Sequence, residues 1–307
     1  MLKLSIMKPA TLKGVLLLMP LLWVSSLYAL EINQGVPAEP SRAPQPVDQE
    51  LLYKVNYAGE DVGYSRVATR ALGSGVQVTE LLDMRVPSFW GETVILTRNV
   101  EQYDESHGIT QGDYVTLFDE YLLVSSLVPA SRGLMKHSFK WFELEDDMLD
   151  ALTKVWNQAA NKNMALQLGW PELMNKIKHL KALESHASFI DPTQFDMTMT
   201  ALSLTLPKLL SQTNTRSVRV FDPDAEDESL FYELSAELVT GHLAKTQVPQ
   251  LNLQQAKIQE AKVQTIKVTR SEGGISHYRF DMSTQPATLI NLVDESGDDR
   301  FELSLKR

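Results

Sequence analysis

Short segments in which apolar and polar residues alternate, each bounded by turn-forming residues, recur along the first half of this chain. Alternation with a period of two places every second side chain on the same face of a strand. The first two segments are separated by the turn 58–61, where Gly59 is expected to adopt a positive φ. Turns this short can join antiparallel strands but not parallel ones, so the pattern predicts an antiparallel sheet. The predicted strands lie at residues 52–57, 62–67, 76–81, 94–103, 114–118, 121–128 and 139–142.

The middle of the chain changes to the spacing of amphipathic helices. Apolar side chains recur every three or four positions between residues 147 and 160. Residues 171–187 repeat this pattern behind Pro171, which suits a first helical turn, and His179 and His186 would share that helix. A third element, from residue 191 to the residue before Pro207, is interpreted as a short helix.

The last third of the chain returns to strand patterns, and this return defines the predicted fold. The class is α+β: a large antiparallel sheet or partly open β-barrel, with two to three helices inserted in the middle of the chain. Residues 49–307 are predicted to form a single β-rich domain with a helical segment at about 145–206. The late strands are expected at residues 217–221, 231–239, 263–269, 276–282, 287–293 and 301–305.

The first 29 residues are typical of a secretory signal peptide. Lys3, Lys8 and Lys13 precede an almost wholly apolar run, and small residues follow it, so cleavage is expected after Ala29. A retained anchor is the alternative, but a membrane span needs about 20 apolar residues and this run is shorter. Residues 30–48 then form a Pro-rich linker. The expected location is the periplasm, without a transmembrane anchor in the mature protein.

Charge and cysteine content exclude several classes of function. Formal net charge is −10, and removal of the leader with its three lysines leaves 26 basic and 39 acidic residues, or −13. Such a chain repels phosphate backbones, so we expect no nucleic-acid partner. The absence of cysteine excludes disulfides, a thiolate nucleophile and cysteine-ligated metals.

No catalytic, cofactor or metal-binding motif emerges from the residue order. The six histidines are scattered, and the sequence holds no nucleophile elbow, P-loop or dinucleotide fingerprint. The acidic run Asp222–Glu228 superficially resembles a calcium loop, but Asp227 replaces its essential glycine, so a solvated acidic turn is predicted there. The turn Asp294–Asp299 is interpreted in the same way. We therefore expect no cofactor, no metal site and no enzymatic activity, with a catalytic carboxylate pair as the alternative.

Four large aromatic residues are the candidates for an apolar ligand groove. In a chain without disulfides such side chains also serve as ordinary core, and this alternative stays open. The four candidates are Phe89, Trp90, Trp141 and Trp170.

Three segments carry a family resemblance. Residues 52–63 join a strand ending in an aromatic residue to a turn glycine and the pair Val62–Gly63. They resemble the opening hairpin of a family of bacterial envelope proteins of unknown function. Residues 286–305 are similar to that family's closing hairpin, and residues 216–222 to its central strand. The resemblance implies a periplasmic, non-enzymatic, β-rich protein, although the helical insert near 145–190 departs from the family's compact pattern.

A looser similarity, at the level of the fold, is to the half-barrel lipoprotein carriers that cup an acyl chain against helices. We therefore expect a soluble periplasmic binding or accessory protein that holds an apolar or envelope-derived ligand. Two alternatives remain: a hydrolase of envelope polymers that uses a carboxylate pair, and a scaffold that binds a protein partner.

Overall fold

The computed structural model describes most of the chain from residue 49 onward. The predicted signal peptide (1–29) and linker (30–48) lie outside the described residues. The described ranges are 49–73, 75–88, 91–104, 108–161, 175, 177–211, 213–225, 230–239, 263–271, 274–284, 287–295 and 300–306.

Eight strands form the first half of the fold, and each predicted strand of this region is confirmed. Seven of them follow one another directly, and the eighth comes after a helix, α2 (Asp146–Asn161). The strands are β1 (Gln49–Tyr57), β2 (Glu60–Leu72), β3 (Gly75–Ser88), β4 (Gly91–Tyr103), β5 (Ile109–Phe118), β6 (Tyr121–Pro129), β7 (Met135–Glu143) and β8 (Glu184–Ile190).

The second half contains a short strand, a helix and six further strands, which also confirm the predicted pattern. The helix is α4 (Met199–Leu209). The strands are β9 (Met197–Thr198), β10 (Thr215–Phe221), β11 (Phe231–Leu238), β12 (Val263–Arg270), β13 (Ile275–Asp281), β14 (Thr288–Asp294) and β15 (Phe301–Leu305).

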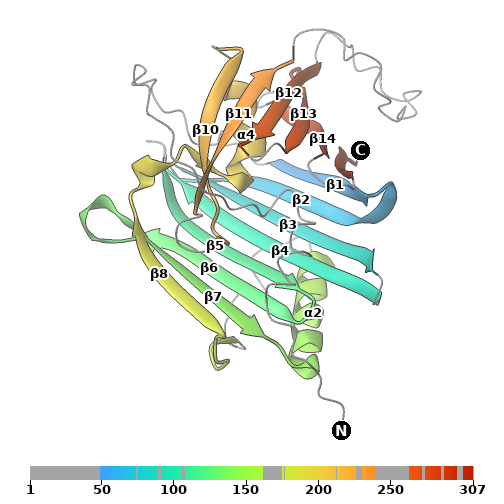
Figure 1. Cartoon of the computed structure of the whole chain (residues 1–307), viewed down its shortest axis with the longest axis vertical. Helices are drawn as coiled ribbons and strands as arrows, with labels where there is room; N and C mark the ends of the chain where they lie inside the picture. The colour runs from blue at the N-terminus through green and yellow to red at the C-terminus, as the bar shows by residue number, and fades with distance from the viewer. Residues whose placement is uncertain are drawn as a thin grey trace.

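All these strands belong to one unclosed sheet. Its order runs from β8 down to β1 (Figure 1), continues through β15, and then runs down to β9. The first and last strands of the described chain therefore pair with each other within the sheet. Every pairing is antiparallel except that of β9 with β10. The prediction of an α+β protein built on a large, barrel-like sheet is thus confirmed, with one short parallel pair added.

Tight turns explain why neighbouring strands in sequence are also neighbours in the sheet. Between β1 and β2 the turn residues Ala58 and Gly59 have φ values of 50° and 87°, as predicted for Gly59. Gly63 follows at a register shift opposite Val55, with φ of 151°. A β-carbon on Gly63 would overlap the backbone carbonyl of Asp83 on β3, so only glycine lets β2 approach β3 there.

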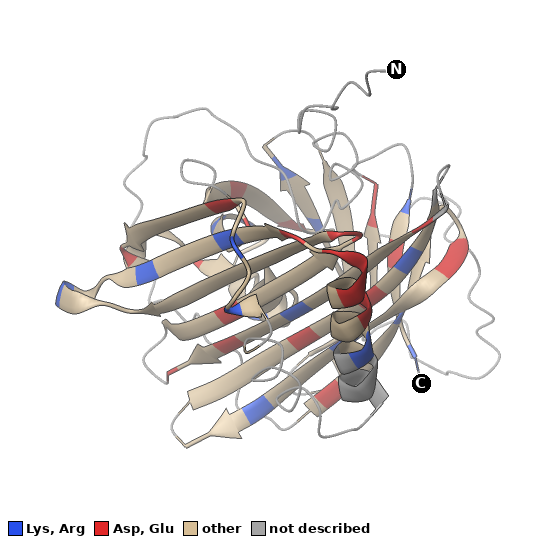
Figure 2. Ribbon diagram, turned by 90° about the horizontal axis from the view of Figure 1, so that it is seen from below, with Lys and Arg blue, Asp and Glu red and all other residues tan. Residues whose placement is uncertain are grey.

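The sheet has an apolar cluster on each of its two faces. We call the face covered by α2 the outer face and the opposite one the inner face. The outer face of β4–β7 is covered by α2, whose Leu152 packs against Leu96, Leu117 and Phe142. The inner face carries the main core, to which both halves of the sheet contribute. Figure 2 shows α2 lying across the strands, with its acidic first turn of Asp146 and Asp147 in red, a placement favoured by the helix dipole.

Helix α4 lies inside the fold and joins the two halves. It contacts β3 of the first half and β10 and β14 of the second. Its Ala201, Leu202 and Leu206 are almost completely buried, and burial of each leucine contributes about 1.5–3 kcal/mol. The predicted short helix is confirmed in kind, but its bounds differ. It begins at Met199, after a 3₁₀ turn (Pro192–Gln194) and β9, instead of at residue 191, and it runs through Pro207 to Leu209 instead of ending before the proline.

The second predicted helix, at residues 171–187, is only partly correct. Residues 175 and 177 are helical, but residues 184–187 belong to strand β8, which pairs with β7. His179 and His186 therefore do not share a helix. Within the described ranges the fold contains two α-helices, α2 and α4, at the lower end of the predicted count.

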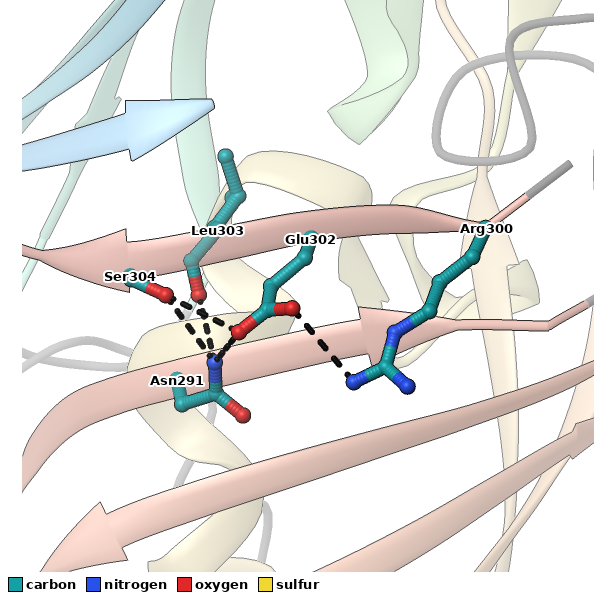
Figure 3. Close-up of polar contacts among 5 residues, drawn as sticks. All are labelled: Asn291, Arg300, Glu302, Leu303 and Ser304. Carbon is teal, nitrogen blue, oxygen red and sulfur yellow. Dashed lines mark hydrogen bonds and ion pairs between the residues drawn. The ribbon is translucent and has the colours of Figure 1, made fainter. Parts of the chain in front are cut away.

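Polar side chains fix the last strands to each other where the chain ends. Asn291 of β14 donates from Nδ2 to Glu302 Oε1 at 2.8 Å, to the Leu303 carbonyl at 3.0 Å and to Ser304 Oγ at 3.2 Å (Figure 3). Arg300 lies 3.4 Å from the other Glu302 oxygen. This network sets the β14–β15 register, and β15 in turn pairs with β1.

Candidate functional site

Three buried acids lie where the second half of the sheet meets the inner face of the first. Glu101 comes from β4, whereas Asp222 and Asp224 come from the turn after β10. We call this contact region the seam. Glu101, Asp222 and Asp224 are 0%, 5% and 3% exposed, respectively. Buried carboxyl groups need either a basic partner or a proton, so the surroundings of each determine its chemistry.

Glu101 is surrounded by hydroxyl groups. Tyr103 donates to Oε2 at 2.5 Å, Thr198 donates to the same oxygen at 2.7 Å, and Tyr114 donates to Oε1 at 3.0 Å. Thr198 also caps α4, because its Oγ1 accepts from the backbone N–H of Ala201 at 3.2 Å. Glu101 thereby links β4 and β5 to the start of the internal helix.

Asp224 inserts between two strands of the first half. Thr116 of β5 donates to Oδ2 at 3.3 Å, and Ser125 of β6 donates to Oδ1 at 3.4 Å. The backbone N–H of Asp224 donates to Asp222 Oδ1 at 3.0 Å, which shapes the turn. Next to them, His137 Nε2 of β7 lies 2.9 Å from the carbonyl oxygen of Pro223. The turn 222–224 is therefore bonded to three successive strands of the other half.

Burial dominates the electrostatics of the seam. It raises the pKa of Asp224 to about 6, although the hydroxyls of Thr116 and Ser125 act in the opposite direction. Burial, with repulsion from Asp224, raises the pKa of Asp222 well above its ordinary value. Burial also raises the pKa of Glu101, against the hydroxyl donors around it. Nearby Glu80 of β3, which accepts from Asn99, has its pKa raised by burial to about 7.

The prediction of a solvated acidic turn at 222–228 is wrong for the described part of that turn. Asp222 and Asp224 are buried because the turn docks on β5–β7, and residues 226–229 lie outside the described residues. In the turn 294–299 the prediction is wrong for Asp294, which is fully buried and ion-paired with Arg270 at 2.8 Å, whereas Glu295 is exposed and residues 296–299 lie outside the described residues. Among the side chains that the structure describes, no group of three His, Asp or Glu residues is placed to hold a metal ion.

Of the four aromatic ligand candidates, the structure describes only Trp141. Phe89, Trp90 and Trp170 lie outside the described residues, so the predicted grouping of the four stays a prediction. Trp141 is half-buried on the inner face of β7. Its ring packs edge-on against Tyr121 of β6, with centroids 5.9 Å apart.

The indole N–H of Trp141 is the chemically unusual feature of this surface. Nε1 is buried and has no hydrogen-bond partner among the described residues. A buried donor without a partner costs about 1–3 kcal/mol, so such groups in folded proteins usually have a reason. Phe139, two residues earlier on the same face, packs against the ring of His186 at 6.2 Å. We call Trp141, Tyr121, Phe139 and His186 the aromatic end of the sheet.

Trp141 was recognisable in the sequence as a large aromatic in a chain without disulfides, whereas the seam was not. Thr116 and Ser125 lie 108 and 99 residues from Asp224 along the chain. The alternation within β5 and β6 places both hydroxyls on the inner face, but which turn would meet them depends on long-range packing.

Comparison with known proteins gives one structural similarity and no function. No family model matches the chain, and no curated protein matches it. Among solved structures, the chain is similar to a β-barrel-like protein of the domain of unknown function DUF1849 from Brucella abortus. The two share 9% sequence identity with a TM-score of 0.49, over 86% of this chain and 98% of the other. That neighbour is a β-rich protein of unknown function, as the sequence resemblance predicts.

In the described part of the chain, every helix is too short or too polar to cross a membrane.

Proposed function

We propose that this protein is a soluble binding or accessory protein of the bacterial envelope, and that it holds an amphipathic ligand at the aromatic end of its sheet. The ligand combines an apolar chain with a hydrogen-bond acceptor. The observation that carries this proposal is the indole N–H of Trp141, buried and without a partner among the described residues. A ligand carboxylate, phosphate or carbonyl oxygen would satisfy that donor.

The surroundings of Trp141 suit such a ligand. The rings of Tyr121 and Trp141 are only partly buried on the inner face, with Phe139 buried beside them, and such ring surface favours packing of a hydrocarbon chain. His186 carries a polar tip beside them, and its Nε2 lies 2.8 Å from Glu184 Oε1. An apolar surface with a few convergent polar groups is the usual composition of small-molecule sites.

The leader-like segment supports the proposed location. Its basic start, apolar run and small residues before Ala29 are the features by which secretory signals are read. A periplasmic protein meets fatty acids and lysophospholipids, which have the required combination of chain and acceptor.

The alternative of a hydrolase with a carboxylate pair gains less support. Asp222 and Asp224 do lie together, but at 5% and 3% exposure neither is placed to meet a polymer that approaches from solvent. A glycosidase pair requires room for a sugar ring between the two carboxyl groups. We therefore favour binding over hydrolysis.

The test is a calorimetric titration of the purified protein with oleate and, separately, with 1-oleoyl-lysophosphatidylethanolamine. Trp141→Phe keeps the ring packing but removes the N–H, so we expect at least a fivefold weaker binding of one probe or both, with the unfolding midpoint little changed. The matched control is Trp156→Phe on α2, which packs on Ala68 and Leu81 and should bind normally. Unchanged affinity in Trp141→Phe, or no binding of either probe to the wild type, would exclude this site.

A further inference from the structure

At the seam, the two halves of the sheet are joined through carboxyl groups whose bonds to described residues come from hydroxyl groups and not from basic side chains. Asp224 accepts from two hydroxyls, and Glu101 accepts from three. Asp294, another buried acid of this chain, does have a basic partner, because it is ion-paired with Arg270. The seam is therefore the place where the closure of this fold depends on whether carboxyl groups carry charge.

We propose that the seam is a proton-dependent clasp, closed while Asp222 and Asp224 are uncharged and loosened when both ionise. In the closed state the turn 222–224 is bonded to β5, β6 and β7 through Thr116, Ser125 and His137. Two carboxylates one residue apart, buried side by side, repel each other and lose hydration. Ionisation therefore favours withdrawal of the turn from the inner face towards water.

In the described part of the chain, no basic group lowers the pKa of Asp222 or of Asp224. Tyr114 of β5 is buried and Tyr232 of β11 is half-buried; burial is the main cause that raises the pKa of each tyrosine, and the charges of Asp224 and Asp222, respectively, add to it. Arg270 of β12 acts on Tyr232, but its guanidinium is ion-paired with Asp294. His137 of β7 is bonded to the Pro223 carbonyl, as described above.

Glu101 forms a second connection of this kind, a buried carboxyl group that accepts hydrogen bonds from hydroxyl groups. It connects β4 to Thr198 at the start of α4, and it accepts from the hydroxyl of Tyr114 on β5. The pKa of Asp224, raised by burial to about 6, puts the change of charge between mildly acidic and neutral pH. The clasp thus tightens on acidification, and it does not depend on the ligand proposed above.

The test measures the distance between the two halves directly. Because the chain has no cysteine, the substitutions Lys136→Cys on β7 and Ser235→Cys on β11, both at exposed positions, give two unique sites for spin labels. We expect the distance distribution from double electron–electron resonance to be narrow at pH 5.5 and longer or broader at pH 8.5. With Asp222→Asn and Asp224→Asn added, it should stay narrow at both pH values, because the amides cannot ionise.

Circular dichroism at both pH values separates loosening of the seam from global unfolding. Asp150→Asn, at an exposed position of α2, is the matched control and should respond like the wild type. A distribution that does not change between the two pH values in the otherwise wild-type protein would overturn the clasp, even if the double Asn variant does not fold. An Asn variant that opens as the wild type does would overturn it equally. Neither result would affect the oleate titration.

Discussion

The seam and the closing strands each bury an aspartate, but they accommodate it in opposite ways. Among the described side chains, Thr116 and Ser125 donate to Asp224, and burial raises its pKa to about 6. Asp294 has Arg270 at 2.8 Å and Ser276 Oγ at 2.7 Å. A carboxyl with an arginine keeps its partner over a wide pH range, whereas a carboxyl with hydroxyls keeps its place most easily with a proton. We therefore expect loss of the basic partner to be the larger perturbation at the closing strands, and a change of pH to act at the seam.

The largest expected effect comes from breaking the ion pair. Arg270→Met would leave Asp294, which is completely buried, without its charged partner, and we expect unfolding free energy to fall by about 3–5 kcal/mol at pH 7. Urea denaturation measures this loss. Adding Asp294→Leu should restore more than half of it, since the uncompensated charge is gone. A loss below about 1 kcal/mol in the single variant would show that Asp294 does not depend on Arg270.

The next effect concerns Asp224, the buried aspartate that accepts from hydroxyl groups, and it is tested through pH. A folded-state pKa raised from 3.8 to about 6 means that the contribution of Asp224 is fully present below pH 3.8 and is lost as pH rises through about 6. The size of this contribution is about 3 kcal/mol. Asp224→Asn cannot ionise, so its unfolding free energy should lack this decline between pH 4 and 7. Urea denaturation at pH 4, 5.5 and 7 checks the difference, and equal slopes in both proteins would contradict it.

A smaller effect is expected where the seam meets α4. Thr198→Val removes both the hydroxyl that caps α4 and a donor to Glu101, while keeping side-chain shape. Loss of a cap and of one bond to a buried acid should lower unfolding free energy by about 2 kcal/mol. Thr215→Val, at the exposed start of β10, is the matched control and should change it little. Similar losses of unfolding free energy in the two variants would show that the Thr198 hydroxyl does not stabilise the junction of the seam and α4.

The strands were predictable because their signal is local. Alternation within each segment, with turns such as Ala58–Gly59 between them, depends only on neighbours in sequence. The error at residues 184–187 has a related cause, since this stretch lacks a strong alternating pattern and its strand character comes from pairing with β7. Tertiary pairing overrides a weak local preference there.

Burial of the acids could not be inferred from the residue order. A run of aspartates between two strands is usually a solvated turn, and the local sequence of 222–228 gives no sign of its partners. Its burial follows from the docking of one half of the sheet on the other, about 100 residues away in the chain. Trp141 is an intermediate case. Its residue type suggests a site, but the lack of a partner for its N–H among the described residues depends on the fold around it.

The smallest expected effect concerns an ion pair that resembles the Arg270–Asp294 pair only in distance. Lys54 Nζ lies 3.0 Å from Asp61 Oδ2, but the two side chains are 47% and 57% exposed. Water screens this pair and both side chains lose conformational freedom in forming it, so Lys54→Met should change unfolding free energy by less than about 0.5 kcal/mol. The same urea series measures it, with Arg270→Met alongside. A loss comparable to that of Arg270→Met would mean that distance, and not burial, decides what an ion pair contributes in this sheet.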